Sequence, residues 1–195
     1  MKLFEIKLTE LSVDEAVSRV ASIVTSKKEP IALLLVGVPA SGKSTFTKKL
    51  EAAVKSANEV MLPIESTDDQ LEVEAKKLGL TYTEFFKKHR DMLDVFAKKM
   101  VSNVKDHVQA KRGFIIDQTM LDSSKRKERL ALTSNDYYRV AITFEIDPTV
   151  VDARLEDRFK KTGKKIPADV MASMREKYQR PTTSEGFNEV IVITS

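Results

Sequence analysis

Five short apolar segments alternate with longer amphipathic stretches along the chain. Each segment is rich in β-branched residues, and the spacers between them are long enough for a helix. Strands joined by helix-sized crossovers indicate a parallel sheet covered by helices on both faces. We therefore predict an α/β fold with a five-stranded parallel sheet. The predicted strands are residues 31–37, 59–64, 113–117, 138–146 and 189–193.

The first 29 residues precede this pattern. They begin with strand-like alternation and continue into an amphipathic stretch, where Ser12 and Glu15 form a capping box for a helix over residues 13–26. No internal repeat or low-complexity linker separates them from the rest. We predict a core domain over residues 30–195 and a strand–helix addition over residues 1–29.

A second capping box predicts a long helix in the middle of the chain. The helix would begin at the capping box of Thr81 and Glu84, and apolar residues at helical spacing predict that it continues to about Ala110. Such a stripe is typical of core packing. His89 and His107 fall on this helix without neighbouring ligand-type residues, so we interpret both as structural or surface residues.

Composition narrows the class of protein. Of 195 residues, 42% are hydrophobic and 32% charged, as in globular domains, and no apolar run approaches the roughly 18 residues that cross a bilayer. The first residues lack the apolar core of a signal peptide. The lack of cysteine excludes disulfides and thiolate chemistry, and we expect a cytoplasmic location. The net charge of +4 permits a polyanionic partner without requiring one.

The stretch "GVPASGKS" matches the phosphate-binding pattern G-x-x-x-x-G-K-[ST]. It follows an apolar strand and precedes a helix, which is the context that the pattern requires. Its backbone N–H groups would cradle phosphates, Lys43 would neutralise the β- and γ-oxygens, and Ser44 would ligate Mg²⁺. The expected cofactors are ATP and Mg²⁺. The nucleotide-binding residues would be Gly37, Val38, Pro39, Ala40, Ser41, Gly42, Lys43, Ser44 and Thr45.

Two aspartates follow the second predicted strand, in "STDDQLE". Ligands of open parallel sheets bind at the carboxyl ends of the strands, so Asp68 could accept the proton of an acceptor hydroxyl beside the γ-phosphate. Asp69 would then cap the helix or contact the acceptor. The alternative is that these residues only cap and stabilise a helix N-terminus.

The third predicted strand ends in "DQT". Asp117 stands where a carboxylate could hold Mg²⁺ through water or anchor the phosphate loop. Gln118 and Thr119 would line the same crevice as Asp68 and contact the acceptor. For Thr119 the alternative is an ordinary turn hydroxyl.

A basic stretch over about residues 154–167 predicts a mobile lid. It begins as a helix and breaks at Gly163, around which four lysines lie within residues 160–165. Arg154 and Arg158 are neighbours on one helix face. Such a lid would neutralise the transferring phosphoryl group and exclude water, although a solvated surface helix would give the same pattern.

Together these motifs resemble the 5′-polynucleotide kinase branch of the P-loop kinases, especially the phage enzymes, without their phosphatase domain. The resemblance runs from about Ile31 to the end, through "GVPASGKST", "STDD", "DQT", "KKTGKKIPADVMASM" and "RPTTSEGFNEVIVI". It implies that the predicted strands lie in the order second, third, first, fourth, fifth. It also implies a location in the host cytoplasm if a phage encodes the chain.

The resemblance also implies residue roles. Asp68 would be the general base, Lys43 would serve the phosphates, and Arg158 would act from the lid. Gln118 and Thr119 would hold the acceptor end.

Three positions depart from the family pattern. The arginine expected three residues after the base is Leu71, and the asparagine expected after "DQT" is Met120. The lid arginine expected before the glycine is Thr162, which leaves Lys161 or Lys164 to take its role. All three losses concern acceptor recognition or transition-state charge.

The sequence thus favours an ATP-dependent kinase that phosphorylates a nucleic-acid hydroxyl, foremost a 5′-OH end of DNA or RNA. One alternative is a small-molecule kinase acting on a nucleoside, sugar or nucleotide-sugar, or a kinase of modified bases in DNA. Another is a nucleotide-binding switch module without an acceptor. The oligomeric state does not follow from the sequence.

Overall fold

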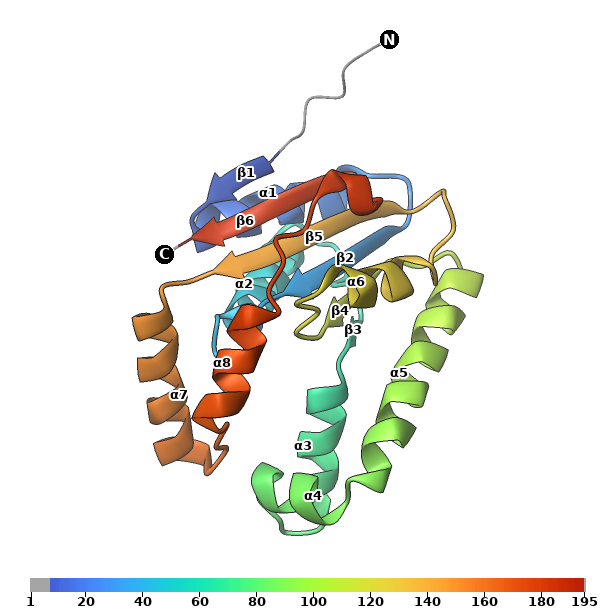
Figure 1. Ribbon diagram of the computed structural model, residues 1–195. Coiled ribbons are helices and arrows are strands. Elements are labelled where there is room, and N and C mark those ends of the chain that lie inside the picture. The colour runs from blue at the N-terminus through green and yellow to red at the C-terminus, as the bar shows by residue number, and fades with distance from the viewer. Residues whose placement is uncertain (1–7, 195) are drawn as a thin grey trace.

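A sheet of six parallel strands forms the centre of the computed structural model, which describes residues 8–194. The strand order is β1-β6-β5-β2-β4-β3 (Figure 1). The predicted α/β class is confirmed, and the five core strands follow the order that the resemblance implies. The strands are β1 (Leu8–Leu11), β2 (Ile31–Val36), β3 (Ile64–Glu65), β4 (Phe114–Asp117), β5 (Tyr138–Glu145) and β6 (Glu189–Thr194).

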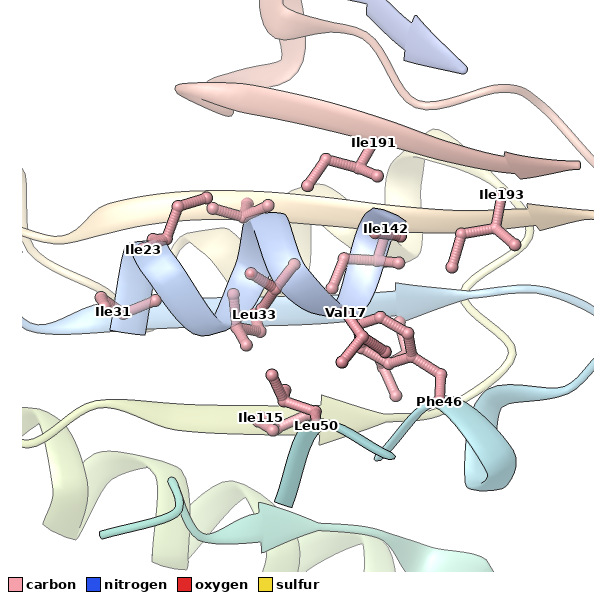
Figure 2. Close-up of a cluster of buried hydrophobic side chains, with 14 of the residues drawn as sticks. Val17, Ile23, Ile31, Leu33, Phe46, Leu50, Ile115, Ile142, Ile191 and Ile193 are labelled. Atoms are coloured by element: carbon pink, nitrogen blue, oxygen red, sulfur yellow. The ribbon is translucent and has the colours of Figure 1, made fainter. Parts of the chain in front are cut away.

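Helices cover both faces of the sheet, and the alternation along the strands decides which face each side chain meets. In β2, Leu33 and Leu35 point to the face covered by α1 and α2, where Figure 2 shows Val17 of α1 above the strands. Leu34 and Val36 point to the opposite face, towards α5 and α6. The helices are α1 (Val13–Ser26), α2 (Lys43–Ser56), α3 (Thr67–Lys77), α4 (Tyr82–Lys88), α5 (Asp91–Gln109), α6 (Ser123–Leu130), α7 (Pro148–Thr162) and α8 (Ala168–Glu176). Within residues 8–194, no helix is long and apolar enough to cross a membrane.

The N-terminal strand and helix are built into this core. β1 extends the sheet by pairing with β6, and Ala16 and Val20 of α1 are fully buried in the same cluster as β2. The part of the predicted addition over residues 1–7 lies outside the described residues. The division into residues 1–29 and 30–195 stays a prediction.

Two details differ from the predicted elements. The second core strand is only the two residues of β3, and the segment before it is not strand. The predicted long helix is broken at His89 and Arg90 into α4 and α5. The break lets α4 fold back onto α3, where Phe85 packs with Leu71 and Phe96 in a small separate cluster. Burial of this aromatic side chain outweighs the continuity of one helix.

A buried ion pair connects α6 to the short helix that precedes β6. The guanidinium of Arg126 in α6 is fully buried and donates two hydrogen bonds of 2.7 Å to the carboxylate of Glu185. Arg126 also donates to the carbonyl oxygens of Met120 and Leu121 at 3.0 and 3.1 Å. One side chain thus connects the loop after β4, helix α6 and the short helix Thr183–Glu185.

We expect the substitution Glu185→Ala to lower the free energy of unfolding by about 3–5 kcal/mol, because it leaves the charge of Arg126 buried without a carboxylate partner. The measurement is urea-induced unfolding. The matched control is Glu128→Ala, which removes the pairs of this exposed carboxylate with Lys125 and Arg129 and should cost less than about 1 kcal/mol. Equal losses in the two variants would contradict the importance of the buried pair.

Candidate active site

The carboxyl ends of β2, β3 and β4 meet at one edge of the sheet and enclose a cavity of about 610 Å³. The cavity brings together most of the residues predicted from separate motifs. Gly37, Val38 and Lys161 are not among the residues that line it. The lining includes Pro39, Ala40, Ser41, Gly42, Lys43, Ser44, Thr45, Ser66, Thr67, Asp68, Asp69, Glu72, Asp117, Gln118, Thr119, Arg154 and Arg158.

The phosphate loop connects the end of β2 to the start of α2. The N–H of Gly37 donates to the carbonyl oxygen of Thr119 at 3.0 Å, which ties the loop to the end of β4. A Cβ atom on Gly37 would lie 2.7 Å from Oγ of Ser41 and 3.2 Å from Cβ of Phe144, so this close approach favours glycine. Gly42 precedes α2 with φ of 109°, a left-handed conformation that likewise favours glycine.

Lys43 folds back over the loop. Its Nζ donates to the carbonyl oxygens of Gly37 and Val38 at 2.8 and 3.1 Å. Burial lowers the pKa of this ammonium, and the charges of Asp117 and Asp68 oppose that change. Oγ of Ser41 is buried and has no hydrogen-bond partner among the described residues. An ammonium and an orphaned hydroxyl in one loop suit a phosphate ligand.

Asp68 lies in the first turn of α3, and both of its carboxylate oxygens are engaged. Oδ1 accepts a hydrogen bond of 2.9 Å from the hydroxyl of Tyr82, and Oδ2 accepts one of 3.1 Å from Nζ of Lys164. The N-cap of α3 is Ser66, whose hydroxyl accepts from the N–H of Asp69 at 3.2 Å. The interpretation of Asp69 as the helix cap is therefore wrong.

Burial in the cavity raises the pKa of two carboxyl groups, those of Asp69 and Asp117. Burial, followed by the negative charges of Glu72 and Asp68, raises the pKa of Asp69. Burial raises the pKa of Asp117 to about 6, against the opposing attraction of Lys43. Carboxyl groups that lose hydration in this way gain from a nearby cation.

Gln118 and Thr119 follow β4 and line the cavity opposite α3. Oε1 of Gln118 accepts from Nε of Arg129 at 3.0 Å, which fixes the orientation of its amide. The loop then turns through Met120, which is buried and has φ of 42°. This conformation is one that asparagine adopts more readily than methionine.

The predicted lid consists of the second half of α7 and the turn that leads to α8. Gly163 ends α7 with φ of 70°, and α8 begins after Pro167. Arg158 lines the cavity and donates to Oε1 of Glu72 at 3.2 Å. Lys161 instead pairs with Asp157 along α7 at 2.8 Å, and its side chain is 71% exposed. In this arrangement Lys161 makes no contact with the site.

The sequence motifs assigned no role to Glu72 or Tyr82, and they left open whether Lys161 or Lys164 takes the role of the arginine expected at Thr162. Glu72 follows Asp68 by four residues, so helical spacing places both carboxylates on one face of α3. The four-residue spacing of Asp68 and Glu72 is visible in the sequence and could have identified Glu72. Tyr82 reaches Asp68 only because α4 folds back onto α3, which no local pattern indicates.

Comparison with known proteins identifies the fold. A family model described as an AAA domain matches residues 33–181. L-seryl-tRNA(Sec) kinase of Methanococcus maripaludis is 26% identical over 159 residues, or 80% of this chain and 55% of that protein. The chain therefore spans about half the length of this curated relative.

Three solved structures share the architecture. One, described as a candidate kinase from Chloroflexus aurantiacus, has a TM-score of 0.58 at 19% identity, covering 85% of this chain and 84% of the other. A chain of the Pnkp1/Rnl/Hen1 RNA repair complex has a TM-score of 0.57 at 21% identity, covering 85% and 49%. A gluconokinase from Sinorhizobium meliloti 1021 has a TM-score of 0.50 at 14% identity, covering 86% and 84%. At these identities the likeness shows the fold, that of P-loop kinases.

The raised pKa of Asp117 predicts a pH-dependent stability. Its carboxyl has an ordinary pKa of 3.8 when unfolded and about 6 when folded, so the folded state binds the proton more tightly. As pH rises from about 4 to above 6, ionisation of Asp117 therefore lowers the free energy of unfolding, and the full loss is reached above about pH 6. We expect Asp117→Asn to gain stability relative to the parent by on the order of 2–3 kcal/mol between pH 4 and pH 7.

Urea unfolding at several pH values, in buffer with a chelator, measures this difference. Asp157→Asn is the control, because its exposed carboxylate is on α7 outside the cavity. A parent-to-variant difference that stays constant from pH 4 to pH 7 would refute the prediction.

Proposed function

The chain belongs to the AAA domain family, and we propose that it is an ATP-dependent kinase of nucleic-acid hydroxyl groups, with a 5′-OH end of DNA or RNA as the acceptor. One observation carries the proposal. A single cavity holds a phosphate loop, the carboxylate of Asp68 and the lid cation Arg158. These are the parts that phosphoryl transfer to an alcohol needs: a phosphate cradle, a base and a mobile positive charge.

In the proposed reaction, the acceptor hydroxyl lies between Asp68 and the γ-phosphate. Its oxygen bonds to the γ-phosphorus as the bond from that phosphorus to the bridging oxygen of ADP breaks. The proton of the hydroxyl passes to Asp68. Lys43 and Arg158 neutralise the charge on the transferring group and on the departing ADP.

The residues present fit ATP and Mg²⁺. The orphaned hydroxyl of Ser41 and the ammonium of Lys43 suit phosphate oxygens. Ser44 and Asp117 would hold Mg²⁺, which supplies positive charge against the β- and γ-phosphates when bound. Among residues 8–194, no group of three or more histidine, aspartate or glutamate side chains forms a metal cage. Mg²⁺ held by one or two protein oxygens, water and substrate phosphates agrees with that arrangement.

Several observations support a nucleic-acid acceptor. The motifs resemble those of 5′-polynucleotide kinases, and the net charge is +4. Within the lid, lysines lie on both sides of Gly163. Among the similar proteins, one is named for its action on an aminoacylated tRNA and another belongs to an RNA repair complex.

One observation favours a small-molecule acceptor instead. Leu71 takes the place of the arginine that would grip an acceptor phosphate, and its side chain is buried between α3, α4 and α5. That position can make no polar contact with a nucleic-acid backbone. The gluconokinase among the similar structures is a small-molecule kinase by its name.

Transfer of label from γ-labelled ATP distinguishes the two acceptors. The acceptors are single-stranded DNA and RNA oligonucleotides with 5′-OH ends, the same oligonucleotides already 5′-phosphorylated, and a panel of nucleosides and sugars. We expect label only on the 5′-OH oligonucleotides. The KM for the oligonucleotide should rise steeply with salt, because its phosphates release counterions on binding. Label on nucleosides or sugars alone would instead establish the small-molecule kinase.

Asp68→Asn should lower kcat by about 10²- to 10⁴-fold and leave ATP affinity nearly unchanged, because the amide cannot accept the proton and residue 68 is not part of the phosphate loop. Steady-state kinetics and nucleotide titration give the two quantities. Asp157→Asn is the matched control and should behave like the parent. Near-normal turnover in Asp68→Asn would remove Asp68 from the reaction.

A further inference from the structure

Lys164 is a lysine at the tip of the lid whose side chain is nevertheless only 4% exposed. Its Nζ lies 3.1 Å from Oδ2 of Asp68, 3.2 Å from Oε1 of Glu72 and 3.5 Å from the centre of the Tyr82 ring. Lysine is almost never buried unless it is paired, and here two carboxylates and an aromatic face surround the ammonium. The three partners come from α3 and α4, across the cavity from α7.

Further contacts attach the same turn to α4. The hydroxyl of Thr83 donates to the carbonyl oxygen of Gly163 at 3.1 Å and accepts from the N–H of Lys165 at 3.3 Å. α3, α4, α7 and α8 all project from the sheet on the same side (Figure 1). The lid is therefore docked on α3 and α4 in this structure, and Lys164 is the charged centre of the contact.

We propose that Lys164 is a positioning residue that latches the lid onto α3 and α4 and, in doing so, orients Asp68 for proton transfer. The second half of this inference rests on the proposed kinase function. With Tyr82 on Oδ1 and Lys164 on Oδ2, the carboxylate of Asp68 is held in one orientation. A carboxylate has about four acceptor positions, so the acceptor hydroxyl still finds a free one.

Glu72 makes the latch compatible with catalysis. Its Oε1 accepts from both Arg158 and Lys164, each at 3.2 Å. When Arg158 turns to the transferring phosphate, Glu72 keeps Lys164 as its partner, so the lid stays docked. Before the phosphate arrives, the two cations Arg158 and Lys164 balance the two carboxylates Asp68 and Glu72.

The latch can be measured without any turnover. Because the chain contains no cysteine, spin labels can be placed on cysteines introduced at the exposed positions Lys76 and Lys160, and pulsed electron paramagnetic resonance gives the distance between them. In this background Lys164→Met should change a narrow distance distribution into a broad one with longer distances. Lys161→Met, the matched control at an exposed lysine three residues earlier in the chain, should leave it unchanged.

A distribution that stays narrow in Lys164→Met would overturn the latch. Glu72→Gln is the second variant, which removes a carboxylate from the other side of the contact and should broaden the distribution as well. Each variant is first compared with the parent by circular dichroism, and the Glu72 variant decides the outcome if Lys164→Met does not fold.

Kinetics test the orientation of Asp68. With the acceptor found by the transfer assay, Lys164→Met should lower kcat at least 10-fold while the KM for ATP changes less than 3-fold. Lys164→Arg should recover part of the loss. Unchanged kcat with a broadened distance distribution would overturn the orienting role and leave the latch. Turnover of no acceptor by the parent would overturn the proposed function, whereas the distance measurement would still decide the latch.

Discussion

The parallel direction of all six strands is the constraint on which the rest of this molecule depends. Because every strand ends at the same edge, the loops that follow β2, β3 and β4 meet there, although 80 residues separate Gly37 from Asp117. With β2 in the middle of the sheet, its phosphate loop has the loop after β4 as a direct neighbour. The hydrogen bond from Gly37 to Thr119 is the local result.

Features that depend on local chemistry could be predicted from the sequence. Apolar strands, the glycines of the phosphate loop and the position of Asp68 after a strand each have a physical signature within a few residues. The structure places Asp68, Gln118 and Arg158 at one cavity, as those signatures indicate. What each of these residues does stays a prediction.

Features that depend on contacts between distant segments could not be predicted. Whether Lys161 or Lys164 contacts Asp68 is decided by the end of α7 at Gly163. The helix leaves Lys161 on its exposed side next to Asp157, and the left-handed turn carries Lys164 back across the cavity. Similarly, the helix break at His89 follows from the packing of Phe85 against Leu71, not from any breaker residue.

The same packing involves Leu71, the position at which the 5′-polynucleotide kinase pattern that the motifs resemble has an arginine. Leu71 contributes to the small cluster that holds α4 against α3, and this contact brings Tyr82 to Asp68. An arginine at position 71 would have to bury its charge in that cluster or displace α4, at a cost of several kcal/mol in either case. The α3–α4 pair that this contact holds is the surface on which Lys164 docks. A leucine at position 71 thus accounts both for the apolar α3–α4 contact and for the lack of a cationic side chain at this position.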